Sequence, residues 1–379
     1  MSFPRLPNES QTAVRPPLDL EREITDELAR LLAPAWTRLD AAFALTVSDE
    51  AAQLILSDGQ RAVPTRPSAR VVELLREHRH RSASVGDGPW WRFLVSVTNT
   101  GEATVDYDYG SEPFPDEHLF PPAAYQADLQ AYPRKTVPVW LAAYVGHQGR
   151  QVRTPKMAVA QAQADVAAGV TATPTALALP PFPLMWARWA VVSAAFVAAN
   201  SQWGPRITAA VGWFEGSKRS GATLHRLPGG RAVLSGGVWN SAELNAVYNH
   251  GAAMPLLYRG APDWVADPVL SPRAGNGLLS FCYWWDGNAW YQGESPDPTA
   301  IGAALPGIWT SRITAEMIAQ ALDTDGNSAI SNLVSAAETY QVTRPMLAHA
   351  LGDGAFETDD AFYQLMLAGT ASSVSAQSV

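Results

Sequence analysis

Residues 91–109 read WRFLVSVTNTGEATVDYDY, and this stretch predicts the fold of the region around it. Apolar side chains recur at every second position on both sides of a central Asn-Thr-Gly, which is the period of a half-buried strand. Two such runs joined by the three residues 99–101 predict a β-hairpin, with Gly101 in the left-handed conformation. The stretch therefore favours an antiparallel sheet.

The register of this hairpin follows from placing Val97 and Val105 on the same face. Paired residue numbers then have a constant sum, and one face of the hairpin collects the large apolar side chains. We expect that face to be buried as the core of the hairpin, with five main members: Trp91, Phe93, Val95, Tyr107 and Tyr109.

The opposite face of the hairpin is polar and acidic. Arg92 lies opposite Asp108 in the predicted register, and Asp106 lies two residues earlier on the same strand. The acidic character continues into a proline-punctuated loop over residues 110–122. The candidate site therefore consists of Arg92 and five carboxylates: Asp106, Asp108, Glu112, Asp116 and Glu117.

The chemistry of Asp106 and Asp108 has three interpretations. Two outward carboxylates on one strand lie about 6–7 Å apart. Such a pair suits a plain solvated face, a docking surface for cations, or acid–base or metal chemistry. A metal site needs further ligands converging from elsewhere, and the sequence shows none. The residues alone leave the choice among these three interpretations open.

Composition narrows the class of protein. The chain has 379 residues, 47% of them hydrophobic and 17% charged, which suits two domains or one large one with buried cores. The net charge of -9 disfavours nucleic-acid binding, which depends on neutralising phosphates. A single cysteine, Cys282, excludes an intramolecular disulfide framework and a multi-cysteine zinc site. We expect no cofactor.

The chain is expected to act in the cytoplasm. Its first ten residues, MSFPRLPNES, lack the apolar stretch of a signal peptide. Residues 182–199 are apolar, but they include Arg188 and barely reach the roughly 20 residues that span a bilayer. A buried core helix is the favoured interpretation, and no membrane association is expected.

Hydrophobic periodicity predicts an α+β fold built of two similar domains, each an antiparallel sheet with packed helices, followed by a C-terminal helical appendage. In the helix over 66–79, Arg79 is expected to point outward, His78 and His80 to be solvated, and Ser68 to cap the N-terminus. The predicted organisation is an arm (1–18), a first domain (19–148), a linker (149–180), a second domain (181–310), helices (311–370) and a tail (371–379).

The two halves have a similar order of elements. Each runs helix, strands, helix, hairpin and acidic proline loop; in the second half the hairpin turn is Asp286-Gly287 and the loop is 294–298. Either a diverged tandem duplication or a chance similarity of two α+β units accounts for this order.

Three further patterns carry no predicted chemistry. Residues 323–327 look like a calcium loop, but Ser328 and Val334 occupy positions that require Gly and Glu, so a loop between helices is expected. Cys282 lies within an aromatic strand and is expected to be a buried, inert thiol. The paired glycines at 229–230 and 236–237 are followed by no Lys-Ser or Lys-Thr, which argues against a phosphate loop.

Residues 20–145 resemble immunity proteins of the YezG-like kind, which accompany bacterial polymorphic toxins. The resemblance rests on aromatic and acidic positions: Trp91, Phe93, Gly101, the run Asp106-Tyr107-Asp108-Tyr109, Tyr125, Asp128, Leu129, Tyr132-Pro133-Arg134 and Pro138-x-Trp140-Leu141. The motifs include no catalytic signature. In actinobacterial relatives this region recurs beside toxin genes.

The resemblance implies a non-enzymatic protein that binds and neutralises a cognate toxin, whose basic active-site cleft would meet the acidic strand and loop. The second half would be a structural lobe or a second toxin-contacting lobe. Two other classes remain as alternatives: a carboxylate-dependent hydrolase with an aromatic-lined cleft, and a structural scaffold of a secretion system. A deep pocket ringed by carboxylates would favour the hydrolase.

Overall fold

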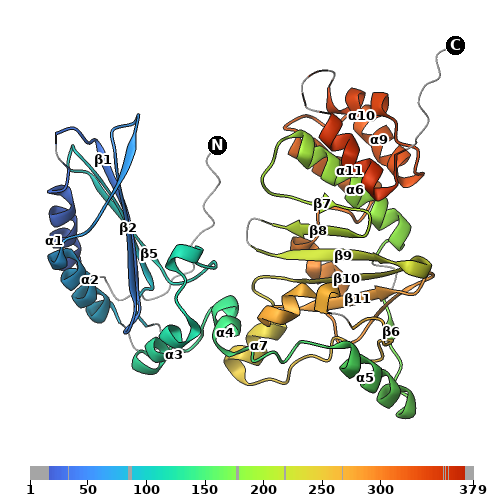
Figure 1. Ribbon diagram of the computed structural model, residues 1–379, viewed down its shortest axis with the longest axis horizontal. Coiled ribbons are helices and arrows are strands. Elements are labelled where there is room, and N and C mark those ends of the chain that lie inside the picture. The colour runs from blue at the N-terminus through green and yellow to red at the C-terminus, as the bar shows by residue number, and fades with distance from the viewer. Residues whose placement is uncertain are drawn as a thin grey trace. The chain divides into compact units, whose positions relative to one another are not determined.

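The computed structural model describes residues 17–32, 34–83, 88–175, 179–216, 219–266, 268–352, 354, 356 and 358–371. The expected arm 1–18 and tail 371–379 lie almost wholly outside the described residues. The chain divides into two compact units, residues 1–145 and 146–379 (Figure 1). Both are α+β with an antiparallel sheet, as predicted.

The first unit is a five-stranded antiparallel sheet with strand order β3-β2-β1-β4-β5. Helices α1 and α2 lie against one face of the sheet (Figure 1). The elements are α1 (Leu18–Ala29), β1 (Arg38–Leu45), β2 (Glu50–Ser57), β3 (Ala62–Thr65), α2 (Ala69–Ser82), β4 (Arg92–Thr98), β5 (Ala103–Asp108), a 3-10 turn (Asp116–His118), α3 (Pro122–Ala131) and α4 (Val139–Gly146).

The predicted hairpin register is confirmed. Phe93 pairs with Tyr107, and Val95 pairs with Val105. The amide of Thr98 donates to the carbonyl of Glu102 at 2.9 Å, which leaves residues 99–101 as the loop, and Gly101 has φ +87°. Trp91, Phe93 and Val95 are buried as expected. The local pattern was sufficient because both strands bury the same face.

Burial of Tyr109 was predicted wrongly. Its side chain is 45% exposed, and Tyr107 is half-buried. Strand β5 lies at the edge of the sheet and ends at Asp108, so Tyr109 lies beyond the last pair of the ladder. Alternation assigns a face to a residue, but burial also depends on how far the covering helices extend over the edge.

The second unit contains a seven-stranded antiparallel sheet with strand order β6-β12-β11-β10-β9-β8-β7. The strands are β6 (Thr173–Pro174), β7 (Arg206–Ile207), β8 (Val211–Glu215), β9 (Gly221–Leu227), β10 (Arg231–Gly237), β11 (Phe281–Trp285) and β12 (Trp290–Gln292). The helices are α5 (Pro155–Ala167), α6 (Phe182–Ala198), α7 (Ala242–His250), α8 (Ser311–Ala321), α9 (Ser328–Glu338), α10 (Arg344–Leu351) and α11 (Asp359–Ala368). Four 3-10 turns lie between them: Pro228–Gly230, Pro268–Leu270, Pro272–Asn276 and Pro298–Ala304.

Helix α6 is the buried core helix that the sequence predicted. The C-terminal helices pack around it and share its core (Figure 1). Its one charged residue, Arg188, donates to Glu338 at 2.7 Å and to the carbonyl of Trp309 at 2.8 Å, so the buried guanidinium is compensated. Among the described residues, no helix is long and apolar enough to cross a membrane.

Two points of the predicted organisation differ in the structure. Residues 149–180, expected as a linker, include β6, which pairs with β12 and so belongs to the second sheet. The order of elements that suggested a duplication does not extend to strand pairing. In the first sheet, β1 lies between β2 and β4; in the second, β7 to β12 follow one another as a meander. The strand orders favour chance similarity.

Candidate functional site

The outer face of the first sheet is an open surface with an apolar floor. Helices α1 and α2 cover the opposite face, so the side chains of alternate strand residues point outward here. A shallow hollow of about 370 Å³ lies across the central strands. It is lined by Asp40, Ala41, Ala42, Gln53, Ile55, Leu94, Val95, Ser96, Thr104 and Asp106.

Asp106 lies at one side of this hollow, on the edge strand. It is exposed, and one carboxylate oxygen accepts a hydrogen bond from the amide of Tyr107 at 2.9 Å. Asp40, on the central strand β1, contributes a second carboxylate to the lining. Arg38 donates to both oxygens of Asp40 at 2.8 and 2.9 Å, and this contact lowers the pKa of Asp40 below its usual value.

Asp108 and Arg92 form an ion pair on the same face, as their predicted opposition suggests. The guanidinium donates to the carboxylate at 2.9 Å, and both side chains are less than one-fifth exposed. The other carboxylate oxygen accepts from the amide of Gly110 at 2.8 Å. Asp108 therefore anchors the start of the acidic loop, and the pair adds no net charge to the surface.

The loop after β5 presents three carboxylates from a fixed base. Glu112, Asp116 and Glu117 are exposed, whereas Phe114 and His118 are buried. The Phe114 ring packs edge-on against Trp140, at 5.0 Å between centroids. Buried aromatic contacts of this kind hold a loop in one conformation.

Asp106, Glu112, Asp116 and Glu117 form what we call the acidic surface. Within the described part of the chain, none of these four side chains is in an ion pair. The burial of His118 at the base of the loop, together with the nearby charge of Arg92, lowers the pKa of its imidazole, so the histidine adds no positive charge near neutral pH. The surface is therefore negative.

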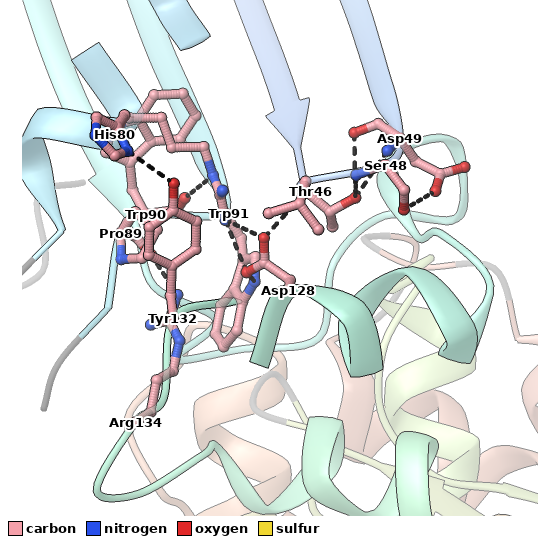
Figure 2. A network of polar contacts seen from close by, with 12 residues as sticks. Thr46, Ser48, Asp49, His80, Pro89, Trp90, Trp91, Asp128, Tyr132 and Arg134 are labelled. Carbon is pink, nitrogen blue, oxygen red and sulfur yellow. Dashed lines mark hydrogen bonds and ion pairs between the residues drawn. The ribbon is translucent and has the colours of Figure 1, made fainter. Parts of the chain in front are cut away.

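A buried carboxylate, Asp128 of α3, fixes the elements that carry this surface. Arg79 donates to both oxygens of Asp128 at 2.8 Å, and Trp91 Nε1 donates to one of them at 3.0 Å. The amide of Val47, in the turn after β1, donates at 3.1 Å. Figure 2 shows Asp128 between Trp91 and the Thr46–Asp49 turn. One carboxylate thus joins α2, α3, the residue that precedes β4 and that turn.

The outward orientation predicted for Arg79 and the solvation predicted for His78 were wrong. Arg79 is 4% exposed and His78 is fully buried. Trp90 Nε1 donates to Nδ1 of His78 at 3.1 Å, so the neutral ring carries its proton on Nε2, which lies 3.3 Å from the hydroxyl of Tyr107. That hydroxyl donates in turn to Glu21. His80 is exposed, as expected.

Burial of His78 makes the stability of the first unit depend on pH. Desolvation lowers the pKa of His78 to about 4, whereas an unfolded chain protonates this ring near 6.5. Between these values the unfolded state binds more protons, so stability should fall as the pH falls from 6.5 to 4, by up to about 3 kcal/mol. Urea unfolding at several pH values should show this slope. His78→Gln should reduce this slope and His80→Gln should not; equal slopes in all three proteins would refute the assignment.

A second hollow, of about 550 Å³, lies beside the Asp128 network. Its lining includes Arg76, Arg79 and His80, a set that suggests an anion site. Arg76, however, donates to Glu50 and Arg79 to Asp128, and His80 contacts the hydroxyl of Tyr132 at 3.1 Å. All three side chains therefore already have hydrogen-bond or ion-pair partners within the protein, which argues against an anion site.

The corresponding hairpin of the second unit forms as predicted but holds its polar groups internally. Trp285 pairs with Trp290 across the Asp286-Gly287 turn. In the acidic loop, Asp297 caps the turn at Thr299.

Two further predictions concern the second unit. Burial raises the pKa of the Cys282 thiol to about 12, which agrees with an inert cysteine. Residues 323–327 connect α8 and α9, as expected.

The described residues contain no group of three or more His, Cys, Asp or Glu side chains that could hold a metal ion. No family model matches the chain, and no curated protein matches it. The functional argument therefore depends on the geometry of the first unit.

Proposed function

We propose that the chain is a non-enzymatic immunity protein, which neutralises a cognate bacterial toxin in the cytoplasm by covering its basic cleft. The observation that carries the proposal is the acidic surface: four exposed carboxylates on β5 and the following loop, without internal ion pairs among the described residues. Electrostatic complementarity of this kind speeds encounter and selects the partner. The resemblance to YezG-like proteins points to the same partner class.

The rigid support of the surface favours binding. Phe114 and the Asp108–Arg92 pair hold the loop, and Asp128 holds the elements beneath it. A surface that is already ordered loses little conformational entropy when a partner docks. The apolar floor beside it includes Ile55 and Leu94. Removing this apolar surface from water on binding would be favourable.

The hollow on the outer face is poorly suited to the hydrolase alternative. It is open, and its two carboxylates are Asp40 and Asp106. A general acid at neutral pH needs a raised carboxyl pKa, whereas the contact with Arg38 lowers the pKa of Asp40. The geometry supports docking better than acid–base catalysis.

Reversing the charge of the loop tests the proposal. The triple variant Glu112→Lys, Asp116→Lys, Glu117→Lys should weaken binding to the cognate toxin by roughly 100-fold or more, because close interfacial charge pairs contribute about 1.5 kcal/mol or more each. Cells that express the toxin should lose protection. The association rate measured by surface plasmon resonance should fall most at low salt.

A matched control places the same change of charge elsewhere. Asp26, Asp325 and Asp360 are exposed, and all three changed to Lys should leave binding and protection intact. Full protection by the loop variant, or equal losses in the two triple variants, would contradict a specific acidic binding surface.

A further inference from the structure

The edge formed by β5 differs from the other sheet edges in the described residues. Strands β6 and β7, at the edges of the second sheet, have two residues each, and β3 carries Pro64 within its four residues. Short edges and edge prolines prevent pairing with other chains. Strand β5 has six residues, ATVDYD, and no proline. It is the edge in this set that can accept another strand.

The register shows which backbone groups of β5 face outward. Thr98 donates to Glu102, and hydrogen-bonded pairs alternate along an antiparallel ladder, so the even-numbered residues of β5 bond to β4. The bond from Asn99 to Thr37 at 3.0 Å agrees, because it directs an odd-numbered residue of the first hairpin strand toward β1. Ala103, Val105 and Tyr107 therefore direct their amide and carbonyl groups away from the sheet.

One of these outward-facing amides, that of Tyr107, already has an acceptor. The carboxylate of Asp106 accepts from it. The amides of Ala103 and Val105 have no hydrogen-bond acceptor among the described residues, and both lie in a strand that ends at an exposed loop. Two donors and three carbonyl groups are thus arranged with the spacing of a β-ladder.

Side chains on the two faces of β5 define the sequence that an added strand would need. Asp106 and Thr104 point to the outer face, whereas Val105 and Tyr107 point to the inner face and pack against the core. A neighbouring strand places its own side chains on the same two faces in alternation. Basic residues would meet the carboxylate of Asp106, and apolar residues would continue the core.

We propose that β5 accepts an extended segment of the partner, with alternating basic and apolar residues, as an added sixth strand. The inference rests on the proposed function only for the identity of the partner as a toxin. A second copy of this chain is disfavoured as the occupant, because its own β5 carries the same carboxylates, Asp106 and Asp108, and pairing the two edges would bring like charges together. Main-chain bonds would give affinity and the alternating side chains specificity.

A pair of synthetic peptides tests strand addition without the toxin. The first alternates lysine and valine and is long enough to pair with β5; the second has the same sequence, with N-methyl groups on the backbone amides that would face β5. Both have the same charge. Fluorescence anisotropy should show binding of the first peptide and about tenfold weaker binding of the second, because donated backbone bonds are lost. Amide exchange at Ala103 and Val105 should slow only with the first.

A variant of the protein gives an independent arm. Ala103→Pro removes an outward donor and keeps the ladder to β4, because the amide of residue 103 does not bond inward. It should weaken binding of the unmethylated peptide. Ala123→Pro, at an exposed position in the first turn of α3, is the matched control and should bind normally. Unchanged thermal unfolding of both variants verifies that they fold.

The outcomes separate this proposal from the proposed function. Equal binding of the two peptides, no binding of either, or unchanged binding by the folded Ala103→Pro variant would overturn strand addition. Any of these leaves toxin neutralisation by charge intact, since the lysine variants of the loop test that independently. Loss of protection by the loop variant together with failure of both peptides would mean that the toxin docks on the surface without pairing to β5.

Discussion

Asp128→Ala is expected to lower the free energy of unfolding of the first unit by about 3–5 kcal/mol. The change leaves the Arg79 guanidinium buried without its counter-charge, and it removes the acceptor for Trp91 Nε1 and the Val47 amide. Since domains of this size are stable by only about 5–15 kcal/mol, such a loss approaches global unfolding of the unit. Urea unfolding followed by amide NMR signals of residues 92–98 measures it.

A double variant separates the ion pair from the other bonds. Arg79→Met with Asp128→Leu replaces both charges by apolar groups, so it should be more stable than Asp128→Ala alone, although two donors stay unpaired. Asp26→Ala, at an exposed position, should change stability by less than about 0.5 kcal/mol. A loss below about 1 kcal/mol for Asp128→Ala would show that the network contributes little to the fold.

Phe93→Ala should cost about 3–5 kcal/mol, because it removes a fully buried ring and leaves a cavity. The ring contacts His78 and Tyr107 at 5.4 and 5.6 Å between centroids, so those neighbours would lose packing. Tyr109→Ala, from the same predicted face, should cost less than about 1 kcal/mol, since Tyr109 is 45% exposed. Denaturation of the two variants side by side measures the difference. Equal costs would contradict the observed end of the sheet at Asp108.

The hairpin could be predicted from sequence because its determinants are local. Alternation fixed the register, and the register brought Arg92 opposite Asp108, which the structure shows as an ion pair. The acidic loop residues were also identified, since exposed carboxylates between prolines follow directly from the residue types. Whether a carboxylate has a cationic partner depends on residues that are distant in the sequence. The absence of ion pairs at these residues, within the described part of the chain, is therefore visible only in the fold.

The burial of His78 and Arg79 does have a signal in the sequence. Val71, Leu74 and Leu75 face the core, and positions 78 and 79 continue the same stripe by steps of four. Their polar side chains favour exposure, whereas their positions on the helix favour burial, and the positions decide. Buried polar side chains occur where partners compensate them, and the partner Asp128 lies 49 residues away from Arg79. No local pattern shows such a pairing.

The order of the strands in each sheet could not be predicted from the sequence either. The two halves present a similar order of helices and strands, yet β4 joins the sheet beside β1, whereas β11 joins beside β10. Which strands become neighbours depends on packing across the whole core, and no local sequence pattern encodes it. For this reason, an acidic edge in the first sheet does not imply one in the second.

Hydrogen–deuterium exchange of the full chain, alone and mixed with the proposed cognate toxin, tests the central claim most directly. Binding through the acidic surface and β5 predicts slower exchange at residues 103–118, at the outward amides of Ala103 and Val105 above all. Protection confined to residues 146–379, or no complex at all, would contradict it.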